Sequence, residues 1–293
     1  MKINYKYIGV VFILLALFLC CENTPNEPTY QKEIAVFGYL WGNKNLNADH
    51  AIMLAYTQPI TDYYKWEKAA IKNAKVTLTD MNSGKVYELD TTPDRPGYYF
   101  NDSLLIKPQT AYELRAEVDG KVVTATTTVP PVLKTTSKLR TDTTNYVYYD
   151  NISFEKPVFL ECESPDQIIL VDMYCNETYE TAEYITEFYG HKKPENEDEY
   201  EEGSNGEPRH IMGFGKYETF ASDYYPGQFV VDWYSSMIVF YGAYSLQILA
   251  IDDNYSDFIT TQEYREYKSG IKGGIGVFGS MTGETFKLMV LKP

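Results

Sequence analysis

Histidine and cysteine are scarce in this chain of 293 residues, which contains three histidines and four cysteines. The histidines are widely separated, and no cysteines have the Cys-x-x-Cys spacing of a zinc site. Basic residues are also few, because 26 Lys and Arg face 41 Asp and Glu. Nucleic-acid binding needs a basic surface, which a net charge of −15 does not supply. We therefore expect no nucleic-acid partner, no resident metal ion and no cofactor.

Catalytic signatures are missing as well. The chain has no Gly-x-Ser-x-Gly elbow, no His-Glu-x-x-His motif, no phosphate-binding Walker loop and no dinucleotide fingerprint. Two carboxylates that meet in space, as in a glycosidase, would leave no trace in the sequence, but an abundance of acids by itself predicts no site. We expect no catalytic residues and no enzymatic activity.

The longest apolar run, residues 8–19, is too short to cross a bilayer, since a transmembrane helix needs about 20 apolar residues. Two lysines precede it, which is typical of a signal peptide. Cys20 and Cys21 follow directly, and this arrangement resembles a bacterial lipoprotein signal, in which a cysteine behind the cut becomes the lipidated N-terminus. A plain secretory signal with incidental cysteines is the alternative. We predict a signal peptide over 1–20.

The choice of lipidated cysteine depends on the residue before the cut. Cleavage before Cys20 would leave bulky Leu19 there, whereas cleavage before Cys21 leaves a smaller side chain, so we predict Cys21 with Cys20 as the alternative. Cleavage also removes two lysines and no acidic residue, which takes the net charge from −15 to −17. Anionic lipid repels such a body, so stable attachment requires more than one acyl chain. Residues 21–31 are predicted to form a tether.

Short alternating segments between turn signals continue as far as Pro130-Pro131, which is the pattern of an antiparallel sandwich. Seven strands are predicted at 34–41, 51–55, 75–80, 85–89, 97–100, 111–118 and 121–129. A helix is predicted at 63–71. We expect an Ig-like or transthyretin-like sandwich over 32–131, large enough to fold alone.

The last two of these strands form the clearest element. Asp119-Gly120 supplies the positive φ angles of a two-residue hairpin turn. The turn places Ala116 opposite Val123 and Leu114 opposite Ala125, so that apolar residues share one face.

A second β-rich domain is predicted over 132–293, which makes the chain all-β with two tandem sandwiches. Its strands are expected at 147–154, 157–162, 168–176, 228–233, 243–251, 274–278 and 286–291. The alternation stops between 181 and 215, where residues 195–202 contain six acids. We interpret that segment as a solvated loop, with a calcium site as the alternative.

Residues 252–263 have part of a calcium-loop spacing. Asp252, Asn254, Ser256 and Glu263 occupy loop positions 1, 3, 5 and 12. Asp257 stands where such a loop needs glycine, and a strand-like segment precedes it. A polar exit from a strand is therefore our interpretation, with the calcium loop kept as the alternative. The glycines at 270–279 lack the lysine and helix of a phosphate cradle and predict turns and a bulged strand.

Export would place Cys162 and Cys175 in an oxidising compartment, where a disulfide is possible. A tight turn at 163–167 would instead put residue 162 opposite residue 168, so the disulfide and two buried free thiols both stay open. Trp41, Trp66 and Trp233 are candidates for stacking on a ligand, with burial in the core as the alternative.

Four sets of segments resemble a known family. They are IAVFGYLWG with HAIMLAYTQPI, NAKVTLTD with GKVYEL, PGYYF with TAYELRAEVDGKVVTATTTVP, and DDNYSDFITT with GGIGVFGS. They resemble the Bacteroidota lipoproteins of domain-of-unknown-function family 4249 over nearly the whole mature chain. The acidic segment 195–202 has no counterpart in that resemblance.

The resemblance implies an outer-membrane lipoprotein, on the periplasmic face or the cell surface, of a kind often encoded near TonB-dependent receptors. It implies no established activity. We expect a lipid-anchored extracytoplasmic binding or assembly module, accessory to a TonB-dependent outer-membrane transport complex and attached through its acylated cysteine. A free-standing surface glycan- or protein-binding lipoprotein is the alternative.

Overall fold

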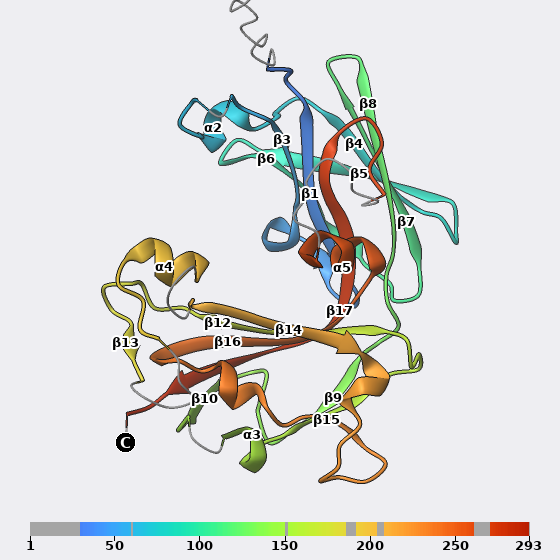
Figure 1. Ribbon diagram of the computed structural model, residues 1–293. Helices are drawn as coiled ribbons and strands as arrows, with labels where there is room; N and C mark the ends of the chain where they lie inside the picture. The colour runs from blue at the N-terminus through green and yellow to red at the C-terminus, as the bar shows by residue number, and fades with distance from the viewer. Residues whose placement is uncertain are drawn as a thin grey trace, which may run out of the picture.

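A computed structural model describes residues 30–59, 61–149, 152–185, 192–203, 208–260 and 270–292. The predicted signal peptide, both candidate lipidation cysteines and most of the tether lie outside these residues. Strands dominate the described chain, which confirms the all-β class (Figure 1). Within the same residues no helix combines the length and the apolarity needed to cross a membrane.

Every strand predicted before residue 131 is present. The strands are β1 (Ile34–Trp41), β2 (Asn45–Leu46), β3 (Ile52–Tyr56), β4 (Lys75–Asp80), β5 (Lys85–Thr92), β6 (Arg95–Leu105), β7 (Ala111–Val118) and β8 (Lys121–Thr128), with a 3-10 turn, η1 (Ala48–His50). Only β2, two residues long, has no predicted counterpart. Alternation is a dependable signal for β4, β7 and β8, because these strands bury one face and leave the other more exposed to water.

The β7–β8 hairpin has the predicted register. Ala116 pairs with Val123 and Leu114 with Ala125, and all four side chains are buried. Asp119 and Gly120 have φ angles of 49° and 77°, as the turn requires.

The helix predicted at 63–71 is shorter, and only α2 (Trp66–Ala69) is helical. Its C-terminal end is drawn into the sheet, because Ala70 bridges Ala55 and the Ile71 N–H donates to the Leu54 carbonyl at 2.9 Å. A tertiary contact therefore overrides the local helix preference of the alanines.

The second half contains more elements than alternation predicts. Its strands are β9 (Lys134–Thr136), β10 (Thr144–Val147), β11 (Val158–Glu161), β12 (Ile168–Cys175), β13 (Glu183–Tyr184), β14 (His210–Lys216), β15 (Phe229–Val231), β16 (Phe240–Ile251) and β17 (Ile275–Val290). Its helices are α3 (Ile152–Glu155), α4 (Glu197–Glu202) and α5 (Asp253–Thr260), with 3-10 turns η2 (Tyr217–Phe220) and η3 (Tyr234–Met237). The predicted strand 147–154 is wrong, since its described residues contain only the last residue of β10 and most of α3.

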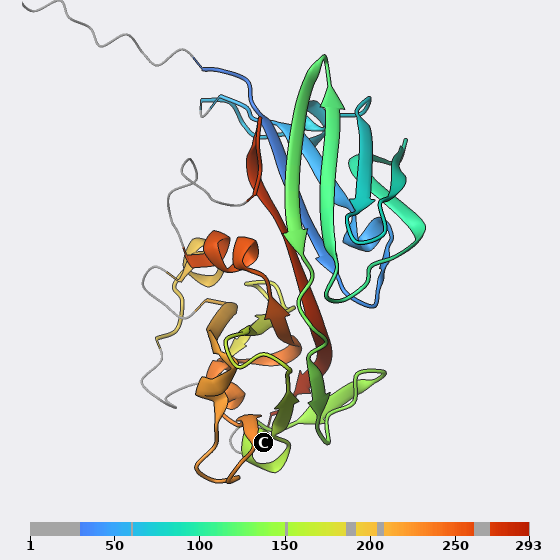
Figure 2. The same cartoon turned by 90° about the vertical axis from the view of Figure 1, so that its right-hand side faces the viewer.

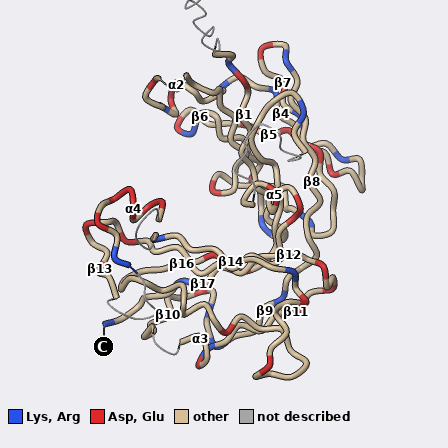
Figure 3. Tube along the Cα trace, viewed as in Figure 1, with Lys and Arg blue, Asp and Glu red and all other residues tan. Residues whose placement is uncertain are grey.

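The predicted acidic loop is also wrong, because residues 197–202 form helix α4 (Figure 3). The Asn196 side chain caps the helix by accepting from the Glu199 N–H at 2.9 Å, and Gly203 ends it with φ 74°. Glu199 and Tyr200 are buried on the inner face. One helical turn can expose most of an acidic run while burying two of its members, which charge counting along the sequence does not reveal.

Strand β17 corrects the two separate strands predicted at 274–278 and 286–291. It is one strand of 16 residues that passes through both halves of the molecule (Figure 2). From Ile275 to Met281 it pairs in parallel with β1. From Met281 to Val290 it pairs with β16 in the antiparallel sense, and from Lys287 onward it also pairs with β10.

The sheet of the first half is completed by this distant strand. The sheet path runs β17-β1-β3-β6-β5-β4-β7-β8, and a bridge between Thr124 of β8 and Lys272 closes it back to the segment before β17. Phe278 of β17 is fully buried in the first core. Residues 32–131 therefore do not contain the whole of the core that they surround.

The second core lies between the sheet β14-β12-β16-β17 and the small sheet β15-β11-β9. A third, smaller cluster connects the halves at the corner of the molecule. It consists of Trp41, Leu170, Leu249, Ile251 and Met281, with Tyr255 and Ile259 of α5 packed against it.

Candidate functional site: a polar cleft between the two halves

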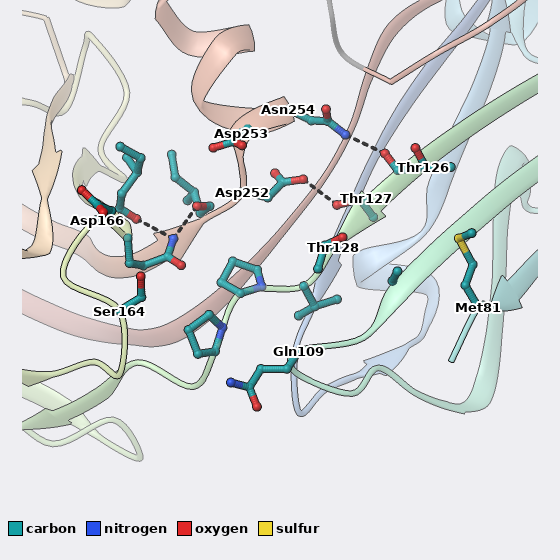
Figure 4. Close-up of a pocket in the computed structure, with 17 residues that line it drawn as sticks. Met81, Gln109, Thr126, Thr127, Thr128, Ser164, Asp166, Asp252, Asp253 and Asn254 are labelled. Atoms are coloured by element: carbon teal, nitrogen blue, oxygen red, sulfur yellow. Dashed lines mark hydrogen bonds between the residues drawn. The ribbon is translucent and has the colours of Figure 1, made fainter. Parts of the chain in front are cut away.

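A cleft of about 720 Å³ opens at the corner where the two halves meet (Figure 4). Four regions line it: the end of β8 with the following prolines, the turn before β12, the junction of β16 with α5, and the adjoining turns after β4 and before β7. The lining residues are Met81, Gln109, Ala111, Thr126, Thr127, Thr128, Val129, Pro130, Pro131, Ser164, Asp166, Gln167, Ile168, Ile251, Asp252, Asp253 and Asn254.

Asp252 is the most enclosed acid of the cleft. It directly follows β16, and its Oδ1 accepts the Tyr255 N–H at 3.0 Å, which caps helix α5. The same oxygen accepts the Ser280 N–H of β17 at 3.0 Å, and Oδ2 accepts the Thr127 hydroxyl of β8 at 2.5 Å. One carboxylate thus connects three elements from distant parts of the chain.

Burial raises the pKa of Asp252 above its ordinary value of 3.8. The hydrogen bonds from Thr127, Ser280 and Tyr255 favour the carboxylate, and the charge of Asp253 disfavours it. Desolvation is the largest of these effects, so the site holds its proton more tightly than an exposed aspartate does.

Amide side chains fix the remaining walls. Asn254 Nδ2 donates to the Thr126 carbonyl at 2.7 Å and to the Phe278 carbonyl at 2.9 Å. Gln167 Nε2 donates to the Ile251 carbonyl at 2.6 Å. These bonds go to backbone atoms on neighbouring strands, so the walls of the cleft are held in place before any ligand arrives.

The lining is rich in hydrogen-bond acceptors and carries no positive charge. Asp166, Asp252 and Asp253 are its acids, accompanied by threonine and serine hydroxyls and by amides, and neither Lys nor Arg is among the lining residues. Lys216 reaches one of these acids from outside, with its Nζ 2.9 Å from Asp166 Oδ1. Such a lining suits a ligand that donates hydrogen bonds and carries no negative charge.

The residues of the calcium spacing have other roles. Asp252 caps α5, Asn254 binds two carbonyls, and the Ser256 N–H donates to the Asp252 carbonyl within the helix. Glu263 lies outside the described residues. Across the part of the chain that the structure describes, no three His, Cys, Asp or Glu side chains are grouped as a metal site would require. The segment predicted as a strand-to-loop exit leads into a helix.

None of the three candidate tryptophans lines the cleft. Trp41 is 9% exposed, and its ring has Lys44 Nζ 3.4 Å from the centroid. Trp66 is half-buried and donates from Nε1 to the Pro96 carbonyl at 3.1 Å. Trp233 is 37% exposed and covers Gly213 of β14.

Cys162 and Cys175 are both free. Cys175 is buried at the end of β12, and burial raises the pKa of its thiol. Cys162, just after β11, is half-buried.

The cleft itself was not predicted from the sequence. Two local signals mark its walls, namely the run Thr126-Thr127-Thr128 before Pro130-Pro131 and the two acids that directly follow β16. Taken alone, each of these signals is typical of the polar end of a strand. Their proximity follows only from β17, which brings the two halves together.

Comparison with protein families supports one assignment. A family model described as "Domain of unknown function (DUF4249)" matches residues 39–287. No curated protein matches the chain. Because the family match covers most of the sequence, the chain belongs to this family of proteins with a shared domain of unknown function.

Proposed function

We propose that the protein is a lipid-anchored extracytoplasmic binding or assembly module of the Bacteroidota outer membrane, accessory to a TonB-dependent transport complex, and that the cleft between its halves receives the ligand. The observation that carries this proposal is the cleft, whose walls are pre-formed by side-chain hydrogen bonds between distant segments. Clefts between structural units are common binding sites. The proposed role is binding rather than catalysis.

The same proposal includes the finer fold description, two tandem sandwiches of which the first is Ig-like or transthyretin-like. Two separate apolar cores support it, one in each half. Strand β17 then belongs to both sandwiches, and the cleft lies between them.

The partner is tested by purifying the tagged, full-length protein from native membranes in mild detergent. A β-barrel partner recovered in near-equal amount is the expected result. The variant Asp253→Lys places a positive charge at the mouth of the cleft and should abolish this recovery. Glu155→Lys on α3 makes the same change of charge at an exposed position outside the cleft and should leave it intact. Equal recovery with both variants would show that the cleft is not the binding site.

The anchor is tested by metabolic labelling with palmitate. Cys20→Ser should keep the label and Cys21→Ser should lose it. The reverse result would show that Cys20 is the lipidated residue. Label in both variants would show that neither cysteine alone is required for lipidation.

A free-standing glycan-binding lipoprotein is favoured by one observation, the exposed ring of Trp233. It stacks on Phe220 with 6.4 Å between ring centroids, which presents an aromatic platform beside β14. Binding on a glycan array that Trp233→Ala abolishes, without a co-purified barrel, would support this second function.

A further inference from the structure

The polypeptide leaves the fold at one end of the first sandwich. Tyr30 donates from its hydroxyl to the Thr57 carbonyl, and the Glu33 N–H donates to Thr57 Oγ1 at 3.0 Å. Eight residues lie between Cys21 and Tyr30 in the sequence, and the nine peptide units that join the two residues span at most about 30 Å. Anchorage at Cys21 therefore keeps this end of the body close to the bilayer surface.

An aromatic loop is located at the same end, close to the start of β1 (Figure 1). Gln58, next to Thr57, donates from Nε2 to the Lys65 carbonyl at 2.9 Å, which holds the loop 61–65 beside the chain entry. Tyr63 is 90% exposed and Tyr64 is 56% exposed. These are large apolar surfaces that the fold leaves in water.

The base of this loop is firmly packed. Trp66 packs against Tyr98 with 5.1 Å between ring centroids and the rings tilted by 59°, and its indole N–H donates to the Pro96 carbonyl. The two tyrosines are therefore exposed on a loop whose base is packed in the folded protein. Such a loop loses little conformational entropy when its side chains contact a partner.

Charge at this end differs from the rest of the molecule. Four lysines, Lys32, Lys65, Lys68 and Lys72, accompany four acids, Glu33, Asp62, Glu67 and Asp119, of which Asp119 accepts a hydrogen bond from Tyr56. The two signs are therefore balanced here, whereas the whole chain carries −15. Figure 3 shows both signs mixed near α2, in contrast to the acidic helix α4. Tyrosine rings flanked by lysines are the side chains that settle at the level of lipid headgroups.

We propose that Tyr63, Tyr64 and the neighbouring lysines form a membrane-contact surface, which rests on the headgroups of the bilayer that holds the acylated Cys21 and so orients the cleft relative to the membrane. This proposal rests on the lipid anchor proposed above. Two tyrosine side chains bind lipid too weakly to hold the protein on a bilayer by themselves. The contact therefore requires the acyl anchor at Cys21.

The test uses the full mature lipoprotein in vesicles of phosphatidylethanolamine and phosphatidylglycerol. In a Cys162→Ser background, a polarity-sensitive fluorophore is attached at Tyr63→Cys or at Tyr224→Cys. Tyr224 is a matched control, because it is 77% exposed and lies in the second half, beyond η2. The expected result is a blue shift and quenching by spin-labelled lipid at position 63, and neither effect at position 224.

Palmitate labelling separates the two proposals. A labelled chain with equal quenching at both positions, or with none at either, would overturn the membrane-contact surface alone. A chain without label, and without quenching at position 63, would overturn both. As a second measure, Lys65→Glu with Lys68→Glu should reduce quenching at position 63, and an unchanged signal would exclude any contribution of the lysines.

Discussion

At the scale of single residues, the molecule depends on a few polar side chains that join distant segments. Asp252 and Asn254 connect the start of α5 with β8 and β17, at separations of up to 128 residues along the chain. Removing one partner would leave buried donors unpaired, at a cost of about 1–3 kcal/mol each.

We expect the protonation of Asp252 to appear in the pH dependence of stability. Its folded-state pKa is raised by burial, so its contribution is fully present below the ordinary value of 3.8 and is lost as pH rises through the folded-state pKa. The wild type should therefore lose stability relative to Asp252→Asn between about pH 4 and neutrality. Urea unfolding of both proteins across this range is the measurement. A constant difference in unfolding free energy would contradict the prediction.

His210 provides a second titration. Its Nε2 lies 2.6 Å from Asp172 Oδ1, and this hydrogen bond raises the pKa of the imidazole against burial and the charge of Arg209. In contrast, burial lowers the pKa of His50. NMR titration should show His210 deprotonating at higher pH than His50.

Asp172→Asn should lower the pKa of His210 and leave that of His50 unchanged. The stability contributed by the pair is present below pH 6.5 and is lost as pH rises through the raised pKa. If the two histidines titrate in the opposite order, the described hydrogen bond is not maintained in solution.

At the scale of elements, β17 is the strand on which both halves depend. Glycines allow this strand to lie close to its neighbours. Gly276 has φ 111°, and a Cβ added there would lie 2.1 Å from the Val36 carbonyl oxygen of β1. Gly283 has φ 141° and stands in the same relation to the Ile248 carbonyl of β16. Only glycine combines this backbone conformation with so close an approach.

Gly276→Ala should therefore destabilise the protein by roughly 3 kcal/mol or more, through strain and loss of β1–β17 pairing. Gly227→Ala is the matched control, because φ is 77° there and an added Cβ meets nothing within 4 Å. The control should cost only about 1–2 kcal/mol. Similar losses for both variants in thermal or chemical unfolding would mean that contact with Val36 is unimportant.

At the scale of the whole molecule, the two halves share one strand and are expected to unfold together. The first core includes Phe278, and β1 has its parallel partner at 275–281. We now expect the isolated fragment 32–131 to show no cooperative transition, because it lacks that strand and exposes β1 as an edge.

Fusing residues 270–283 to this fragment through a flexible linker should restore the transition. Tryptophan fluorescence and circular dichroism, followed together during chemical denaturation, measure both proteins. A cooperative, coincident transition of 32–131 alone would show that it folds without β17 and would support the domain boundary at Pro130-Pro131.

The sequence by itself determined the local structure of the first half and the pattern of the β7–β8 hairpin. Alternation and turn residues act between neighbours, so the pairing of Leu114 with Ala125 could be read directly from the residues around Asp119-Gly120. It also predicts the signal peptide and the lipidated cysteine, which stay predictions. Helix α4 and strand β14 were not predicted, because an acidic run and a strand interrupted by glycines show no clear hydrophobic periodicity.

Only the tertiary structure decided the continuity of β17, the closure of the sheet in the first half and the position of the cleft. Each depends on contacts between residues more than 100 positions apart, such as Thr127 with Asp252 and Val36 with Gly276. Strand pairing at that distance is selected by the packing of the whole core, since the backbone groups of many strands offer equivalent partners. A polar threonine run and a pair of aspartates become one site because burial of apolar residues elsewhere brings them together.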